Sequence, residues 1–221
     1  MQFSIVIATY NRCTLLQRAV RSALSQTLLA QVIVVDDASS DHTAAVMSAW
    51  QADLLDRGDD RLIYVRNPKN CGHSASVNRG VEVAQRDWIK LLDDDDYLHP
   101  NCLAVMAEAI GAHARRFGQG LRPAAAICSC QAAQVDLQEM ELSRTLRTGP
   151  GRAYYIPQED VHYGMLLETV PFGTPAQVAF RREAFLSARG WDSTLDTNFD
   201  DIDAWIRIAQ FGDAIFVNEC L

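Results

Sequence analysis

The stretch FSIVIATYNR at residues 3–12 is an apolar, β-branched run that ends abruptly in polar residues. Such a run is typical of a strand buried on both faces of a sheet. Residues 14–26 then carry apolar side chains at helical spacing, and a second apolar run, QVIVVDD, occupies residues 31–37. This order of strand, helix and strand predicts the first unit of an α/β fold.

The same alternation extends through the rest of the first half. After a helix that starts near residue 41, the pattern predicts strand 61–67, helix 74–85 and strand 87–93. A βαβαβαβ order predicts a Rossmann-like, mainly parallel central sheet with helices on both faces.

The second half has a weaker pattern. Residues 137–176 are rich in glycine, proline and charge, which predicts long loops with one short helix. The remaining expected elements are helix 99–117, strand 124–136, strand 177–182, helix 183–190, helix 200–212 and a strand at the end of the chain.

Composition and charge narrow the classes of function. The chain has 221 residues, of which 48% are hydrophobic and 22% charged, as in ordered globular proteins. With 20 Lys and Arg against 28 Asp and Glu, the net charge of −8 disfavours a nucleic-acid partner. No apolar run is long enough for a membrane helix, and the first residues, MQFSIVIATYNR, lack the charged-then-apolar layout of a signal peptide. These features predict a cytoplasmic protein and leave peripheral membrane association open.

The six cysteines and five histidines do not form a recognisable metal or nucleophile motif. The cysteines are scattered, without Cys-x2-Cys pairs, which favours reduced thiols over disulfides or zinc. The histidines lack HExxH spacing. The chain also lacks a G-x-S-x-G elbow and a phosphate-binding P-loop.

Polar residues follow three of the predicted strands directly. Thr9 and Tyr10 follow the first strand, Asp37 ends the second, and the run from Asp93 to Asp96 follows the fourth. In an open parallel sheet, ligands bind outside the carboxyl ends of the strands. We therefore expect these side chains to surround one crevice.

The run of four aspartates at 93–96 is the densest charged feature of the sequence. Adjacent carboxylates repel one another, and a buried strand leading into them makes their ionisation less favourable. Carboxylate oxygens suit Mg²⁺ or Mn²⁺, which also bind phosphate oxygens. The alternative is a solvated acidic turn before the next helix, and composition alone does not decide between the two.

The late helix begins with Asp200, Asp201 and Asp203. A carboxylate here could act as a general base, although stabilisation of the helix dipole is the more common reason for acids in a first turn. Asp201 lies four residues before Trp205, so we expect it, rather than Asp200, to face the crevice. Asp203 is expected to pair with Arg207. The predicted buried stripe consists of Ile202, Trp205, Ile206 and Ala209.

Taken together, these segments resemble the family 2 glycosyltransferases, the large inverting group with the GT-A fold. The similarity is highly specific because six short motifs occur in the family's order across nearly the whole chain. They are SIVIATYNR at 4–12, IVVDDASSD at 33–41, NCGHSASVNRG at 70–80, LDDDDYL at 92–98, GWD at 190–192 and FDDIDAWIR at 199–207.

The resemblance implies a GT-A fold and an inverting transfer of sugar from a nucleotide-diphosphate sugar, expected to be a UDP-sugar, to an acceptor hydroxyl. It implies Mn²⁺ or Mg²⁺ as cofactor and an aspartate as base. It also implies a role in polysaccharide or cell-envelope glycan biosynthesis, with a carbohydrate, a lipid-linked sugar or a protein as acceptor.

Site residues carry over from matching motif positions. The resemblance assigns Asp201 as the catalytic base and places Trp191, Asp192 and Asp200 on the acceptor side. It assigns Asp93 and Asp95 to the metal. It assigns nucleotide binding to Thr9, Tyr10, Asp37, Asn78 and Asp94, with Asp37 at the base and Asp94 near the ribose.

The chain departs from the family pattern in two places. Val77 stands where the family often has an arginine, so a phosphate contact is either missing or supplied by Arg79. The family usually continues beyond the last strand, so we expect a C-terminally truncated glycosyltransferase domain. Within a single domain over 1–221, residues 1–98 are expected to bind the nucleotide and residues 99–221 the acceptor.

Three other functions remain as alternatives. A nucleotidyltransferase would need a basic, glycine-rich loop after the first strand, where this chain has TYNR. A binding module would bind the nucleotide sugar without turnover. A processive polysaccharide synthase is disfavoured because membrane helices and a Q-x-x-R-W motif are missing from the sequence.

Overall fold

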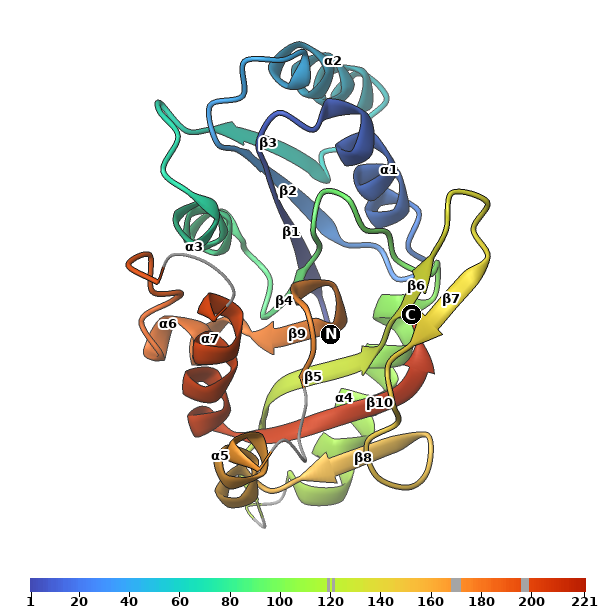
Figure 1. Ribbon diagram of the computed structural model, residues 1–221, viewed down its shortest axis with the longest axis vertical. Coiled ribbons are helices and arrows are strands. Elements are labelled where there is room, and N and C mark those ends of the chain that lie inside the picture. The colour runs from blue at the N-terminus through green and yellow to red at the C-terminus, as the bar shows by residue number, and fades with distance from the viewer. Residues whose placement is uncertain (119, 121, 168–171, 196–198) are drawn as a thin grey trace.

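The computed structural model describes residues 1–118, 120, 122–167, 172–195 and 199–221. Its main feature is an eight-stranded sheet with the order β3-β2-β1-β4-β9-β5-β10-β8 (Figure 1). These strands are β1 (Phe3–Thr9), β2 (Gln31–Asp36), β3 (Leu62–Arg66), β4 (Trp88–Leu91), β5 (Ala125–Gln131), β8 (Ala153–Ile156), β9 (Val178–Arg181) and β10 (Asp213–Cys220). A separate hairpin is formed by β6 (Ala133–Val135) and β7 (Glu141–Arg144).

Helices cover both faces of this sheet, as the sequence predicts (Figure 1). On one face lie α1 (Cys13–Leu24), α2 (Thr43–Asp56) and α4 (Cys102–Phe117). On the other lie α3 (His73–Val83), α5 (Gln158–Leu166), α6 (Arg182–Ser187) and α7 (Asp200–Ile208). Two short 3₁₀ turns, η1 (Pro175–Gln177) and η2 (Ala209–Phe211), complete the described elements.

The two faces explain why the strand sequences are apolar throughout. Every residue of β2 is buried, because its side chains alternate between two hydrophobic cores. Val32 and Val34 pack in the core under α1, whereas Ile33 and Val35 pack in the core under α3.

The predicted α/β fold is confirmed, with a mostly parallel sheet that contains two antiparallel strands. β1 pairs in parallel with β2 and with β4, and β5 pairs in parallel with β10. β9 is antiparallel to both β4 and β5, so it joins the two parallel parts of the sheet. β8 is antiparallel to β10 at the edge.

The region 124–136 differs from the single long strand that we expected. The strand stops at Gln131, whose side-chain Nε2 donates to the carbonyl of Thr145. The amide of Ala132 donates to the hydroxyl of Thr145. Pairing with a segment that lies farther along the chain therefore divides the run into β5 and β6.

The region 137–176 is also more regular than expected, because it contains β7 and β8 in addition to the predicted short helix. All four residues of β7 are exposed, and β8 has a single fully buried residue, Ile156. The alternation in β8 is short and weak, because only Ala153 and Tyr155 pack, partly buried, against one core, and β7 has none. Their partners, β6 and β10, define them instead.

No helix in the described part of the chain is both long and apolar enough to cross a bilayer. All six cysteines are free, as predicted.

The sheet order places the predicted strand ends side by side. β1 lies between β2 and β4, and its last residue, Thr9, is in register with Asp36. The carboxyl ends of β1, β2 and β4 therefore meet at one edge, as the crevice prediction requires.

Helix α3 packs closely against β1 and β2 at Gly80. A Cβ atom at Gly80 would lie 2.4 Å from Val6 Cγ1 and 3.3 Å from Val35 Cγ2. We predict that Gly80→Ala lowers the free energy of unfolding by about 1–3 kcal/mol, because two β-branched core side chains must move. Gly111→Ala in α4 is the matched control, since its Cβ would approach nothing closer than Arg115 Nη1 at 3.4 Å. Urea denaturation of both variants measures the difference, and equal stability would contradict this packing.

Candidate functional site

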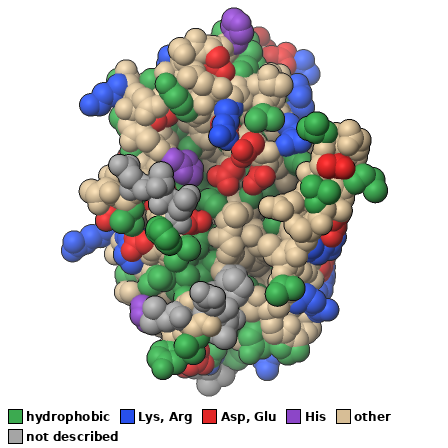
Figure 2. All heavy atoms as spheres, in the orientation of Figure 1, with side chains coloured by type: hydrophobic (Ala, Val, Ile, Leu, Met, Phe, Trp, Pro, Cys, Tyr) green, Lys and Arg blue, Asp and Glu red, His purple; other side chains and the backbone are tan. Residues whose placement is uncertain are grey.

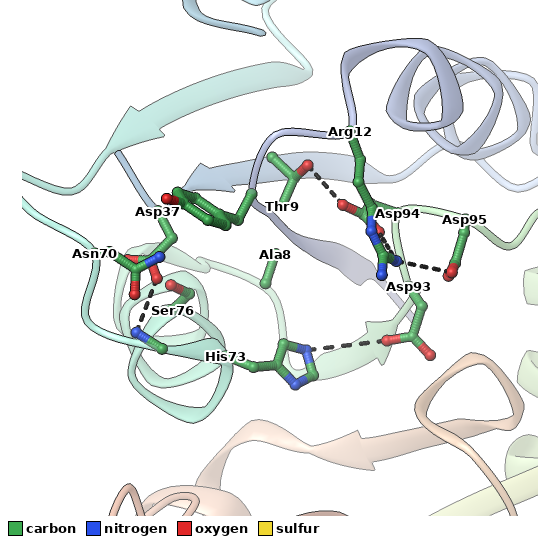
Figure 3. Close-up of a pocket in the computed structure, with 12 residues that line it drawn as sticks. Ala8, Thr9, Arg12, Asp37, Asn70, His73, Ser76, Asp93, Asp94 and Asp95 are labelled. Carbon is green, nitrogen blue, oxygen red and sulfur yellow. Dashed lines mark hydrogen bonds and ion pairs between the residues drawn. The ribbon is translucent and has the colours of Figure 1, made fainter. Parts of the chain in front are cut away.

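A cavity of about 370 Å³ opens at the carboxyl ends of β1, β2 and β4 (Figure 3). It contains most of the side chains that the sequence assigns to the nucleotide and the metal. These are Thr9, Tyr10, Asp37, Asp93, Asp94 and Asp95. The space-filling view shows acidic side chains gathered near the middle of this face, beside basic ones (Figure 2). We call this hollow the first cavity.

Asp37 lines the first cavity and also fixes its wall. Its Oδ1 accepts hydrogen bonds from Asn67 Nδ2 at 2.7 Å and from the Cys71 amide at 2.8 Å. Its Oδ2 accepts from the Gly72 amide at 2.8 Å. The carboxylate therefore holds the turn before α3, a structural role that the sequence pattern does not reveal.

Arg79 and Asn78 lie on α3 but are not among the residues that line the first cavity. Arg79 Nη1 donates to Asn67 Oδ1 at 2.7 Å, and Asn67 in turn donates to Asp37. Arg79 therefore contacts Asp37 only through Asn67. Asn78 forms a reciprocal pair with the backbone of Trp191, accepting from its amide at 2.8 Å and donating to its carbonyl at 2.9 Å. Asn78 therefore does not line the first cavity, where its contact with the nucleotide was expected. Its hydrogen bonds instead link α3 to the turn at Trp191.

The acidic turn after β4 is partly neutralised by groups from the end of β1. The hydroxyl of Thr9 donates to Asp94 Oδ2 at 2.7 Å. Arg12 Nη1 lies 3.2 Å from Asp94 Oδ1 and 2.8 Å from Asp95 Oδ2. Sequence analysis missed this role of Arg12, although its place directly after the first strand was a usable signal.

Asp93, like Asp96, forms no side-chain hydrogen bond or ion pair with Thr9 or Arg12. Among the described residues the side-chain carboxylate of Asp93 accepts no hydrogen bond, and His73 Nε2 lies 4.0 Å from its Oδ1. Burial, followed by repulsion from Asp96 and Asp95, raises the pKa of Asp93 to about 7. The ammonium of Lys90 opposes this rise, but it is fully buried and donates to the carbonyls of Leu91 and Ala176.

These properties fit a divalent cation at Asp93 and Asp95. The oxygen donors suit Mg²⁺ or Mn²⁺, and the raised pKa of Asp93 reflects a carboxylate that lacks a compensating charge. In the described ranges, no group of three His, Cys, Asp or Glu side chains forms a complete metal site. A cation held at Asp93 and Asp95 would correspond to the common arrangement in which one or two carboxylates and substrate phosphates share the metal.

A second cavity of about 530 Å³ adjoins the first. Its walls come from the start of α3, from η1, from the turn after α6 and from the start of α7. The lining residues are Cys71, Gly72, His73, Ser74, Asp93, Pro175, Trp191, Ser193, Leu195, Asp200 and Asp201. Gly72, His73 and Asp93 thus line both cavities.

Asp200 and Asp201 both line the second cavity, which corrects the expectation that only one of them would face it. They differ in their partners. Asp200 Oδ2 accepts a hydrogen bond from Ser74 Oγ at 2.9 Å, whereas Asp201 Oδ1 accepts one from the adjacent Ile202 amide at 2.7 Å. Burial raises the pKa of Asp201, and the charge of Asp200 adds to this rise.

The buried stripe of α7 is also shifted from the expected one. Ala204, Trp205 and Ile208 are buried, whereas Ile202 is 44% exposed. Asp201 lies three residues before Ala204 and four before Trp205, so it is on the same side of the helix as this buried stripe. The predicted pair of Asp203 and Arg207 is confirmed, with 2.7 Å between Arg207 Nε and Asp203 Oδ2.

Trp191 and Asp192 take different positions. Trp191 is buried and lines the second cavity, with its ring edge-on to His73 and to Trp205. Asp192 is not among the lining residues. Its Oδ1 accepts from the amide and hydroxyl of Thr194, and these bonds lower its pKa. The structure thus places Asp192 in a turn that its bonds to Thr194 hold, next to Trp191 in the chain.

The sequence is similar to a named glucosyltransferase and to a protein of succinoglycan biosynthesis. It is 34% identical over 123 residues to a GalNAc(5)-diNAcBac-PP-undecaprenol beta-1,3-glucosyltransferase of Campylobacter jejuni, covering 54% of this chain and 38% of the relative. It is 35% identical to succinoglycan biosynthesis protein ExoO of Rhizobium meliloti, covering 48% of this chain and 28% of that protein. The chain therefore spans well under half the length of both relatives.

Solved structures share the fold at low sequence identity. TarS 1-349 of S. aureus in complex with UDP superposes with a TM-score of 0.74 at 16% identity, over 99% of this chain and 58% of that one. A mannosyltransferase from Pyrobaculum calidifontis with GDP-Man and Mn²⁺ gives 0.66 at 20% identity, over 99% and 55%. The fold is thus the GT-A fold.

The family model described as glycosyl transferase family 2 matches residues 4–187, from the start of β1 to the end of α6. It includes the strand ends, the acidic turn and the start of α3 that form the first cavity. This chain therefore belongs to glycosyl transferase family 2.

Proposed function

We propose that the chain transfers a sugar from a nucleotide-diphosphate sugar, most simply a UDP-sugar, to an acceptor hydroxyl with inversion at the anomeric carbon. The observation that carries this proposal is the pair of adjoining cavities that share Asp93. One cavity has carboxylates suited to a metal-bound diphosphate, and the other contains Asp201. A donor and an acceptor bound there would meet at the shared wall.

The first cavity is the proposed donor site. Asp37, together with Thr9 and Tyr10, would bind the nucleoside, and Asp94 would lie near the ribose. Asp93 and Asp95 would hold Mn²⁺ or Mg²⁺ against the diphosphate. When bound, the cation neutralises the negative charge that develops on the leaving nucleoside diphosphate. Arg12, which contacts Asp94 and Asp95, adds a second positive charge beside this position.

The second cavity is the proposed acceptor site, and Asp201 is the proposed base. The acceptor hydroxyl oxygen forms a bond to the anomeric carbon while the bond from that carbon to the diphosphate oxygen breaks. The hydroxyl proton passes to the Asp201 carboxylate. Attack opposite the leaving group inverts the anomeric carbon. Ser74 holds Asp200 beside the base through a hydrogen bond, and Asp200 does not take the proton.

The relatives support a role in polysaccharide or cell-envelope glycan synthesis, with a carbohydrate, lipid-linked or protein acceptor. We propose residues 1–98 as the donor half and residues 99–221 as the acceptor half of one domain. The acceptor half is completed by Cys71–Ser74 and Asp93 from the donor half. A cytoplasmic location stays a prediction. A module that binds the donor without turnover is the competing proposal, and the hydrolysis assay below separates the two.

The metal assignment predicts coupled binding of metal and nucleotide. UDP should bind the wild-type chain at least ~10-fold more tightly with Mn²⁺ than with EDTA, about 1.4 kcal/mol. Asp95→Asn should abolish this difference, because it removes a cation ligand yet keeps an oxygen for Arg12. Asp53→Asn is the control, since Asp53 pairs with Arg57 on the exposed surface of α2. Calorimetry that gives equal UDP affinity with and without metal in the wild type would contradict the assignment.

The base assignment predicts different effects for two neighbouring residues. Asp201→Asn should lower the rate of donor hydrolysis, with water as acceptor, by at least ~100-fold while donor affinity stays within about twofold. Asp200→Asn should lose much less activity, because its amide oxygen can still accept from Ser74. The assay follows release of nucleoside diphosphate. Full activity in Asp201→Asn with none in Asp200→Asn would reverse the assignment.

The raised pKa of Asp93 predicts a pH dependence of stability in metal-free buffer. An unfolded aspartate has a pKa of about 3.9, whereas that of Asp93 is about 7 in the folded chain. The folded state binds the proton more tightly, so ionisation of Asp93 lowers stability as pH rises from about 4 to 7, and the penalty is complete above 7.

Asp93→Asn should therefore raise the free energy of unfolding at pH 8 by about 1–4 kcal/mol and leave it nearly unchanged at pH 4. Denaturant titrations at the two pH values measure this difference, with Asp53→Asn as the surface control. A gain at pH 4 that equals the gain at pH 8 would show that the effect is not ionisation of Asp93.

A further inference from the structure

The two cavities share a wall to which few of the described residues contribute. Among the described residues, Gly72, His73 and Asp93 alone line both cavities. Under the proposed function, the sugar that is transferred lies at this wall, because its anomeric carbon must face the diphosphate on one side and the acceptor on the other. Gly72 has no side chain, and Asp93 is a proposed cation ligand. His73 is therefore the remaining side chain that faces both cavities and is free to contact the sugar from either side.

His73 is held in a defined orientation at this place. It is the first residue of α3 and points toward Asp93 in the close-up view, with 4.0 Å between its Nε2 and Asp93 Oδ1 (Figure 3). Its ring lies edge-on to the buried ring of Trp191, with 5.4 Å between centroids and an interplanar angle of 81°. Its side chain nevertheless remains 46% exposed.

This setting suits recognition of a hydroxyl group. An imidazole has two ring nitrogens that donate or accept hydrogen bonds, and packing against Trp191 has already restricted its rotation. A hydrogen bond to a sugar hydroxyl therefore loses little additional side-chain entropy. In the neighbouring segment, Asn78 holds the Trp191 backbone, so α3 positions both the imidazole and the ring behind it.

We propose that His73 contacts the transferred sugar of the donor and contributes to the selection of that sugar. This assignment rests on the proposed function. It makes His73 a contact for the glycosyl group, whereas the nucleoside is assigned to Asp37, Thr9 and Tyr10.

The test compares affinities for a nucleoside diphosphate and for its sugar conjugate, each with Mg²⁺. The probes are UDP with UDP-glucose and UDP-GlcNAc, and GDP with GDP-mannose. The variant His73→Phe keeps an aromatic ring against Trp191 but has no hydrogen-bonding nitrogen. His73→Gln keeps a hydrogen-bonding group, and His42→Gln, at an exposed position before α2, is the control.

We expect His73→Phe to keep the wild-type melting temperature and to bind the diphosphate within about twofold of wild type. Its affinity for the nucleotide sugar should fall about tenfold, the size of one lost hydrogen bond. His73→Gln should recover part of that loss, and His42→Gln should show none.

Two results would overturn the assignment. Equal loss of diphosphate and nucleotide-sugar affinity in His73→Phe would place its contact at the nucleotide or the cation, and no loss of either would show that the ring serves packing alone. A wild-type chain that binds none of these diphosphates would instead remove the proposed function itself. Failure of the inference about His73 is thus distinguishable from failure of the proposed function, because in the first case the wild-type chain would still bind the diphosphate with metal.

Discussion

The parallel pairing of β1 with β2 on one side and β4 on the other is the constraint on which the site depends. Parallel strands end at the same edge, so Thr9, Asp37 and the acidic turn at Asp93 arrive together although up to about 80 residues of chain separate them. The helices that connect these strands cover both faces, which leaves the strand ends as the open place for a ligand. The first cavity lies there.

Several carboxylates at one edge of the sheet repel one another, and contacts from neighbouring residues compensate this repulsion only in part. Thr9 and Arg12 compensate Asp94 and Asp95 through direct contacts. Asp93 receives no such contact within the described residues, and its pKa is raised to about 7. A group that is unfavourable in the folded chain and lies between two cavities has the properties expected of a functional site rather than of a stabilising one.

The site and the fold share several side chains. Asp37 lines the first cavity while its two oxygens hold the turn at Cys71 and Gly72, and that turn starts α3. α3 in turn presents His73 to both cavities and uses Asn78 to hold the Trp191 backbone. The walls of the two cavities are thereby connected through one helix, so substitutions at Asp37 or Asn78 would change the shape of the site as well as its contacts.

The sequence by itself determined the α/β architecture of the first half, because strands buried on both faces produce continuous apolar runs and amphipathic helices produce a 3.6-residue period. It also determined which acids follow which strands, and its motif order indicated the family. Only the tertiary structure decided that β7 and β8 are strands, that Asn78 holds the Trp191 backbone from outside the cavity linings, and that Asp200 and Asp201 line one cavity together. These features depend on contacts between distant segments, and such contacts leave no periodic pattern in the local sequence.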